Sequence, residues 1–261
     1  MRIIANSLAM EYCLSGPADA PAVTFSHALA ADLTMWAPQA AALEGRYRVL
    51  RYDTRGHGGS EAPDGPYTFM EMVEDVSALM DGVGVQRTHF VGLSMGGMVG
   101  QWLALTQPER VLSLVLCDTS ARMTSEAGDI LDERIAVAAR AGMAAHVDTT
   151  IDRWFTPAFV RDRPDIVDPV RAIIRGTDPR GYIGCAHAAK THDAWERLPE
   201  IAVPTLIIVG EQDPGVGAAE AIHERISGSE LVTLESASHL SNLEQSEAFN
   251  QALLAFISRV A

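Results

Sequence analysis

From residue 89 to residue 98 the chain reads HFVGLSMGGM. The apolar pair Phe90 and Val91 is typical of the end of a buried strand, and residues 98–105 are typical of a helix. Between them lies a G-x-S-x-G pattern centred on Ser94. A serine at a sharp strand-to-helix turn occupies strained backbone, and its neighbours must lack side chains so that the helix can pass close to the sheet. The order of strand, turn and helix therefore predicts a nucleophile elbow with Ser94 exposed at its tip. The alternative is a glycine-rich turn in which the serine is incidental.

The same turn offers a place for the negative charge that develops when a serine attacks a carbonyl group. Backbone N–H groups at the start of a helix have no intrahelical acceptor, so the N–H of Met95 can bind such an oxyanion. In serine hydrolases of this architecture, the loop after the third strand supplies the second donor. Here that strand is residues 22–26, and we assign the second donor to Leu29. We interpret His27, in the same loop, as a residue that bonds backbone and shapes the loop rather than as a catalytic group.

The rest of the chain alternates between short apolar runs and amphipathic stretches. Such alternation predicts an α/β protein with a mostly parallel sheet covered by helices on both faces, and ligands of such sheets bind at the carboxyl ends of the strands. Ser94, Asp213 and His239 each follow a predicted strand. Besides the strand before the elbow, strands are expected at residues 11–14, 22–26, 47–52, 111–117, 204–210 and 231–234, and helices at 36–43, 67–80, 98–105, 218–226 and 246–260.

Between residues 122 and 197 the pattern changes. Strand-like runs disappear, and helical stretches are separated by glycine and proline. We interpret residues 122–197 as a helical cap inserted into one α/β core, which is formed by residues 1–121 and 198–261. The helices of this cap are expected at residues 127–141, 143–154 and 165–175.

A serine hydroxyl is a weak nucleophile and needs an adjacent base, which is itself oriented by an acid. In this architecture the chain order is serine, then aspartate or glutamate, then histidine. Asp213 and His239 stand at the expected places. We therefore predict that His239 is the general base and that Asp213 fixes its tautomer and stabilises the imidazolium. Asp118, at the end of the strand after the elbow, is the rival candidate for the acid.

A glycine-rich turn, DTRGHGGS at residues 53–60, contains Asp53 and Arg55. These two side chains could bind a substrate anion. More often such a pair ties a buried loop together, and this is the interpretation that we favour.

The 261 residues include 34 acidic and 20 basic side chains, for a formal net charge of −14. Such a field repels nucleic acid and anionic membrane surfaces, so we expect neither as a partner, and an anionic substrate would need arginines placed near it. Glycine motifs for phosphate or dinucleotides are absent, and His187 and His192 do not align on one helix face, so we expect no cofactor and no metal. The three cysteines are scattered, which indicates reduced thiols and a cytoplasmic protein.

Together, these features resemble the α/β-hydrolase family, and within it the 3-oxoadipate enol-lactonases of bacterial aromatic catabolism. The elbow and the Arg-Gly-His-Gly turn occur in many α/β-hydrolases, whereas the cap segment is more specific because caps vary with the substrate. The sequence departs from the pattern after the third strand, where Asn-Ser-Leu-Gly is expected and residues 27–30 are His-Ala-Leu-Ala. The resemblance rests on residues 35–39, 48–58, 60–63, 65–67, 92–97, 153–156, 177–178, 181–182 and 238–242.

The resemblance implies that Ser94 opens a five-membered enol-lactone with a carboxymethyl arm, through an acyl-enzyme, to give 3-oxoadipate. The carboxylate of that arm needs a cation in this acidic protein. Arg153 and Trp154, in the expected cap, are the candidate substrate-binding residues. Arg153 is the candidate for the cation because a guanidinium can bind a carboxylate through two hydrogen bonds. The alternative is a surface arginine whose stem packs on the cap.

A small-molecule ester or lactone, most simply an anionic one, is thus the expected ligand of a monomer or small homo-oligomer. Two other functions stay open at this point. One is a carboxylesterase or a lactonase of different substrate range on the same triad. The other is a ligand receptor that keeps the fold without turnover.

Overall fold

The structure, a computed structural model, describes residues 1–260. The strands are β1 (Arg2–Ala5), β2 (Leu8–Ser15), β3 (Ala22–Ser26), β4 (Arg48–Tyr52), β5 (Thr88–Leu93), β6 (Val111–Cys117), β7 (Thr205–Gly210) and β8 (Glu230–Leu234). The helices are α1 (Ala37–Leu43), α2 (Phe69–Gly82), α3 (Met95–Thr106), α4 (Ser125–Ala141), α5 (Val147–Trp154), α6 (Pro157–Asp162), α7 (Pro164–Gly176), α8 (Pro179–Lys190), α9 (Val216–Arg225), α10 (Ser241–Glu244) and α11 (Ser246–Ile257). Four 3-10 helices are η1 (Leu33–Trp36), η2 (Pro108–Arg110), η3 (Met143–His146) and η4 (Trp195–Glu200).

The eight strands form one sheet in the order β1-β2-β4-β3-β5-β6-β7-β8. The β1–β2 and β2–β4 pairs are antiparallel, and every pair from β4 to β8 is parallel. Strands β3, β5 and β7 are buried along their whole length, as expected for parallel strands covered on both faces. The carboxyl ends of the parallel strands meet at one edge of the sheet. Ser94, Asp118 and Asp213 follow three of these ends.

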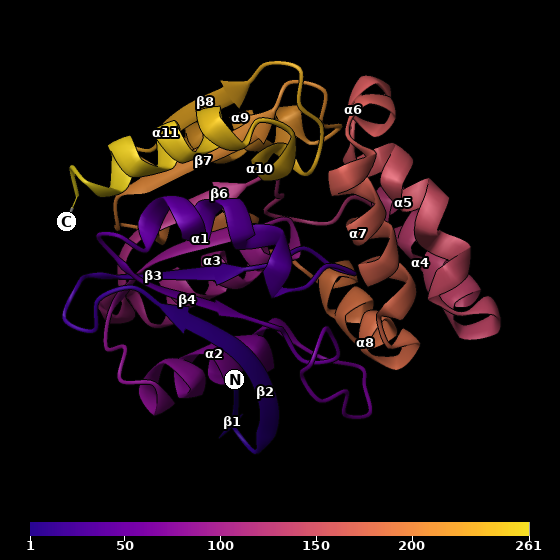
Figure 1. Cartoon of the computed structure of the whole chain (residues 1–261), viewed down its shortest axis with the longest axis horizontal. Coiled ribbons are helices and arrows are strands. Elements are labelled where there is room, and N and C mark those ends of the chain that lie inside the picture. The colour runs from indigo at the N-terminus through magenta and orange to yellow at the C-terminus, as the bar shows by residue number, and fades with distance from the viewer. Residues whose placement is uncertain (261) are drawn as a thin grey trace.

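Helices cover both faces of the sheet (Figure 1). Helices α1 and α11 pack side by side on the face nearest the viewer, and α3 lies behind the sheet against β5 and β6. Helix α2 packs on α3 and β1, and α9 packs on β7 and β8. The helices α4–α8 stand together beyond the end of the sheet, at the right of Figure 1, and all of them come from the single segment between β6 and β7.

The α/β architecture predicted from the sequence is confirmed. The prediction lacks β1, α6, α8 and the four-residue helix α10, and it joins residues 143–154 into one helix where the structure has a 3-10 turn followed by α5. Strand β1 and helix α6 are too short to show a periodic pattern. Helix α8 contains Gly181 and Gly184 and several alanines, so its apolar period is weak.

The small residues of α8 have a packing reason. A Cβ on Gly181 would lie 2.0 Å from the carbonyl oxygen of Gly56, so only glycine permits the two backbones to approach this closely. Nearby, the N–H of Tyr67 donates to the carbonyl of Gly184 at 3.2 Å. Helix α8 is therefore seated directly on the turn that contains Arg55.

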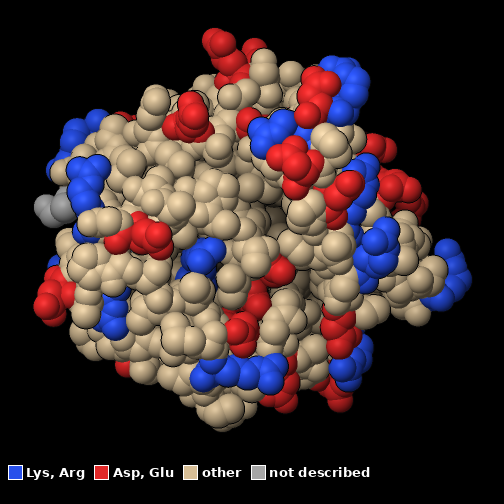
Figure 2. Space-filling view, viewed as in Figure 1, with Lys and Arg blue, Asp and Glu red and all other residues tan. Residues whose placement is uncertain are grey.

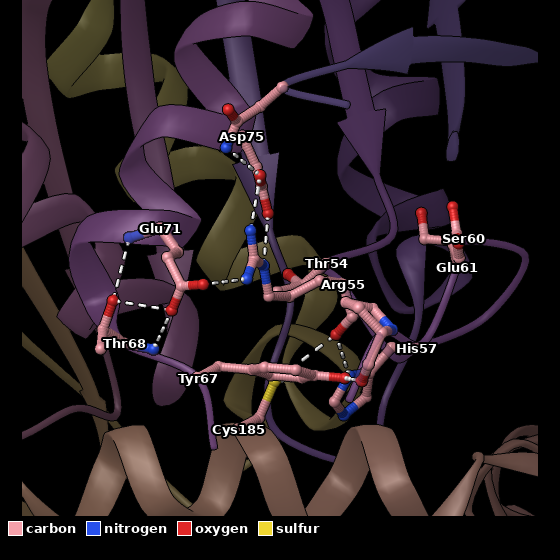
Figure 3. Close-up of polar contacts among 12 residues, drawn as sticks. Thr54, Arg55, His57, Ser60, Glu61, Tyr67, Thr68, Glu71, Asp75 and Cys185 are labelled. Atoms are coloured by element: carbon pink, nitrogen blue, oxygen red, sulfur yellow. Dashed lines mark hydrogen bonds and ion pairs between the residues drawn. The ribbon is translucent and has the colours of Figure 1, made fainter. Parts of the chain in front are cut away.

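Arg55 ties this turn to α2 (Figure 3). Its Nε and Nη2 donate to the two carboxylate oxygens of Asp75 at 2.7 and 2.9 Å, and its Nη1 donates to Glu71 at 2.9 Å. The guanidinium also lies 5.2 Å from the centre of the Tyr67 ring. Burial alone would lower the pKa of Arg55, but the two acids raise it above its usual range. Asp53 instead accepts from the N–H groups of Leu33 and Gly59. Asp53 and Arg55 therefore stabilise the turn through different partners, and not through each other.

We expect Asp75→Ala to destabilise the protein by about 3 kcal/mol, because it leaves the buried guanidinium of Arg55 with only the half-exposed Glu71. The matched control is Asp81→Ala on the same helix, which removes an exposed ion pair with Arg110 and should cost less than about 1 kcal/mol. Urea unfolding of both variants measures the difference. Equal losses of stability in the two variants would contradict the role of Arg55 as a buried tie.

Candidate active site

Ser94 stands at the turn between β5 and α3 in a backbone conformation that few non-glycine residues adopt. Its φ is 54° and its ψ is −115°. A Cβ on Gly92 would lie 2.1 Å from the carbonyl oxygen of Gly96, and a Cβ on Gly96 would lie 2.2 Å from that of Ser26. The two glycines therefore let α3 start directly against the sheet. Strained backbone of this kind is found at functional sites, and here it presents a half-buried serine hydroxyl.

The two residues predicted to be oxyanion donors, Leu29 and Met95, lie at the same cavity as Ser94. Met95 is the first residue of α3, and Leu29 lies in the loop after β3; all three residues line a cavity of about 300 Å³. Within residues 1–260, neither the N–H of Leu29 nor that of Met95 has a hydrogen-bond acceptor. These donors are therefore available for an oxyanion that forms beside the serine.

Histidines hold the loop that contains Leu29. Nε2 of His27 accepts from the N–H of Thr54 at 2.9 Å, so Nδ1 is its donor and bonds the carbonyl of Ala28 at 2.8 Å. His57 accepts from the N–H of Ala30 at 3.0 Å. Burial, together with the neighbouring His27, lowers the pKa of His57 to about 3, so this ring stays neutral. Both histidines shape the loop, as the sequence analysis expects of His27.

His239 and Asp213 are joined across the loops that follow β7 and β8. Nδ1 of His239 donates to Oδ2 of Asp213 at 2.6 Å, and the N–H of Gly215 donates to Oδ1 at 2.6 Å. Burial alone would raise the pKa of Asp213, but the charge and the hydrogen bond of His239 bring it below its usual value. Nε2 of His239 has no partner within residues 1–260 and belongs to a ring that lines the cavity with Ser94. Bonds between a catalytic base and its nucleophile often tighten only when substrate binds.

Asp118, the rival acid, makes different contacts. Its Oδ1 accepts from the N–H of Gly210 at 2.8 Å, and its Oδ2 accepts from the hydroxyl of Ser241 at 2.5 Å. Across the described part of the chain, no hydrogen bond joins Asp118 to His239. Burial, and then the charge of Asp213, raises the pKa of Asp118 well above its usual value, which favours the neutral carboxyl. Asp118 thus connects the loops of Asp213 and His239 without touching the imidazole.

Two arginines reach the cavity from the α4–α8 helices. Arg153, at the end of α5, is exposed to the cavity, and Arg134 of α4 also lines it. Arg134 donates to the hydroxyls of Tyr182 and Thr150 at 3.1 and 2.7 Å, which are uncharged groups. In residues 1–260, neither arginine forms an ion pair with a carboxylate. Desolvation by the cavity walls, and then the charge of Arg134, lowers the pKa of Arg153.

Trp154 differs from the expectation for it. Its side chain is buried in the core and is not among the residues that line the cavity. Arg134 is the cavity residue that the sequence analysis misses. A signal for it exists, because Ala127, Ile130 and Leu131 also line the cavity and occupy the same helical stripe as Arg134, so an arginine ends the inward face of α4.

Figure 2 shows charged side chains of both signs interspersed over the α4–α8 region at the right, with further groups of both signs along the left edge and near the centre of that face. Several of the surface arginines there have acidic partners, such as Arg163 with Asp165 and Arg180 with Asp178. Arg134 and Arg153 differ from them because their positive charges have no acid partner in the described residues. The cavity is therefore lined by two arginines without an ion-pair partner, together with Asp118 and Asp213.

Comparison with known proteins agrees with this geometry. Residues 21–143 match the family described as the alpha/beta hydrolase fold. The chain is 39% identical to 3-oxoadipate enol-lactonase 2 of Acinetobacter baylyi, over 98% of this chain and 96% of that protein. Its structure superposes on the crystal structure of the enol-lactonase from Burkholderia xenovorans LB400 with a TM-score of 0.96 and 37% identity, over 99% of this chain and 100% of the other. A thermophilic esterase from Thermogutta terrifontis, solved with malate bound, has a TM-score of 0.93 and 28% identity, over 100% of this chain and 98% of the other.

The chain belongs to the α/β-hydrolase family, and it is a hydrolase. Within that family it is similar to the 3-oxoadipate enol-lactonases, so the family resemblance predicted from the sequence is confirmed. Among residues 1–260 no helix is both long and apolar enough to cross a bilayer. The same residues contain no group of three or more histidine, cysteine, aspartate or glutamate side chains placed to hold a metal ion.

We expect Asp213→Asn to lower kcat by roughly 10³–10⁴-fold, because the amide would favour the wrong imidazole tautomer. Asp118→Asn should lower kcat by less than about tenfold, since an amide can still accept from Gly210 and bond Ser241. Steady-state kinetics of both variants on one ester measure the contrast. A large loss in Asp118→Asn with near-normal turnover in Asp213→Asn would reverse the assignment of the acid.

Proposed function

We propose that this protein hydrolyses an enol-lactone with a carboxylate arm, most simply 3-oxoadipate enol-lactone, to the open-chain keto acid. The observation that supports this most directly is one cavity that combines Ser94, the Asp213–His239 pair and two arginines without acid partners. The similarity to enol-lactonases over nearly the whole chain supports the same substrate class. We propose further that residues 122–197 act as a cap that supplies the arginines.

In the first half of the proposed reaction, the hydroxyl oxygen of Ser94 attacks the lactone carbonyl carbon. Its proton passes to Nε2 of His239, and the imidazolium that forms is stabilised by Asp213. The N–H groups of Leu29 and Met95 bind the oxyanion. Collapse of this intermediate breaks the ring C–O bond, and the enol oxygen takes the proton from His239.

The leaving enol stays tethered to the acyl group because it was part of the ring. Its tautomerisation to a ketone removes the nucleophile that would otherwise close the ring again. In the second half, His239 takes a proton from water, whose oxygen attacks the acyl carbon bonded to Ser94. The C–O bond to Ser94 then breaks, the serine oxygen regains a proton from His239, and the second carboxylate of the product is released.

The free carboxylate of the substrate is bound by Arg153 and Arg134 in this proposal. A hydrogen bond to a charged group contributes roughly 1.5–3 kcal/mol, which corresponds to about a 10- to 150-fold change in affinity. Both guanidinium groups already lie at the cavity, and neither has to leave an acidic partner to bind a substrate. The energy of the charge–charge contact is therefore not used to break an existing ion pair.

A carboxylesterase of different substrate range is the second candidate. The esterase with malate bound favours it, since that protein shares the fold at 28% identity. The same triad and oxyanion donors serve both reactions, so the two candidates differ in what the cavity beyond the serine accepts.

The test compares two lactones that share the enol-lactone ring. One has the carboxymethyl arm, and the other has a methyl group in its place. Turnover is measured as the loss of ultraviolet absorbance of the lactone. We expect wild-type kcat/KM to be about 10⁴ M⁻¹s⁻¹ or more on the anionic lactone and at least roughly tenfold lower on the neutral one. Ser94→Ala should abolish both reactions. Arg153→Ala should raise KM for the anionic lactone and leave KM for the neutral lactone unchanged.

Arg140→Ala is the matched control, because Arg140 is exposed on α4 and does not line the cavity. It should leave both substrates unchanged. Fast hydrolysis of nitrophenyl esters with no turnover of either lactone would overturn the lactonase proposal and favour the carboxylesterase. Equal KM for the anionic lactone in wild type and Arg153→Ala would overturn the anchoring role of Arg153.

A further inference from the structure

Five hydrogen bonds join the end of α5 to the loop that contains His239. Glu244 supplies the acceptors for three of them: its Oε1 accepts from the N–H and the hydroxyl of Thr156, both at 2.8 Å, and its Oε2 accepts from the N–H of Ser238 at 2.5 Å. The hydroxyl of Ser238 donates to the carbonyl of Arg153 at 3.1 Å. The N–H of Leu240 donates to the carbonyl of Trp154 at 3.0 Å.

These contacts lie next to Arg153 on one segment and on both sides of His239 on the other. Ser238 and Leu240 flank His239, and each of them bonds one of the two consecutive carbonyls that begin at Arg153. Residues 153–154 and 238–240 therefore run in the same direction and are joined at two points, each one residue from His239. A shift of the end of α5 would have to move the histidine loop with it.

Glu244 is an unusual group to find at such a junction. It is 8% exposed, and no arginine, lysine or histidine of residues 1–260 forms an ion pair with it. A buried carboxylate is expensive unless donors surround it, and here three donors from two segments converge on it. A residue with only a packing role would be apolar at this place, so the carboxylate is explained by the three donors that it joins.

We propose that Glu244 is a positioning residue that fixes the anion-binding Arg153 and the general base His239 as one unit, so that binding of the substrate carboxylate aligns the base. The inference rests on the proposed function, since it assumes that Arg153 binds the carboxylate and His239 moves the proton. Correct placement within a fraction of an ångström is worth large factors in rate, and a displacement of about 1 Å can cost roughly 100-fold. The anionic arm of the substrate would thereby contribute to kcat as well as to KM.

The experiment uses the full chain and the two enol-lactones that differ only in the arm. Glu244→Gln replaces one acceptor oxygen by a donor and disrupts the junction. Ser238→Ala is the milder variant, because it removes only the hydroxyl bond to the Arg153 carbonyl. Ser113→Ala is the matched control: it removes a buried hydroxyl bonded to His89 at 2.8 Å on β6, away from the junction.

We expect kcat/KM for the anionic lactone to fall about 30-fold in Glu244→Gln and about fivefold in Ser238→Ala, with a loss of no more than about threefold on the neutral lactone. Arg153→Ala should remove most of this effect, so that adding Glu244→Gln to it lowers the anionic rate by only about threefold. Ser113→Ala should leave the ratio of the two substrates unchanged. Thermal unfolding of every variant identifies losses that come from unfolding alone.

Equal losses on the two lactones, additive with Arg153→Ala, would overturn the coupling and reduce Glu244 to a structural residue. If Glu244→Gln does not fold, the same comparison is made with Ser238→Ala, and an unchanged substrate ratio in that variant overturns the inference. A wild-type enzyme that does not distinguish the two lactones refutes the anchoring of the arm itself. That failure is seen before any variant is measured, so it is distinct from a failure of the Glu244 coupling alone.

Discussion

The close approach of α3 to the sheet at Gly92 and Gly96 is the constraint on which the candidate site depends. Any side chain at either glycine would meet backbone within about 2 Å, so the helix would have to move away from β5. The same approach accompanies the positive φ of Ser94 and places Met95, the first residue of α3, at the cavity. The hydroxyl of Thr119 donates to the carbonyl of Ser94 at 2.7 Å and ties this strained turn to the end of β6. The proposed nucleophile, Ser94, and one proposed oxyanion donor, the N–H of Met95, thus belong to the same turn.

The two cavity arginines are compatible with the proposed anionic substrate although the protein has a net charge of −14. Mobile ions screen surface charges beyond about 8–10 Å at physiological salt, so the groups that line a cavity dominate its potential. On the surface of α6–α8, several arginines are neutralised by nearby acids. Arg134 instead bonds two neutral hydroxyls, which orient its guanidinium and leave its charge for a ligand.

The sequence predicts those parts of the fold and site that depend on short-range patterns. The elbow, the parallel strands and the places of Asp213 and His239 follow from local composition and chain order, and the contact of His239 with Asp213 agrees with them. Helix α8 is not predictable in this way, because Gly181 is required by a backbone contact with Gly56, in a turn more than a hundred residues away.

Distance along the chain also explains what is missed at the site. The local sequence does not reveal the contacts of Glu244, since one of its partners, Thr156, lies far from it in the chain. Trp154 is an error of the opposite kind, a predicted site residue that does not line the cavity. It follows Arg153 on the same helix, but its side chain is buried in the core. The most direct test of an acyl-enzyme on Ser94 is to quench wild-type enzyme with acid early in turnover of the enol-lactone and to measure the mass of the peptide that contains Ser94 by mass spectrometry. We expect an adduct with the full mass of the lactone, because the leaving enol stays attached. An unmodified Ser94 peptide during rapid turnover would contradict this expectation.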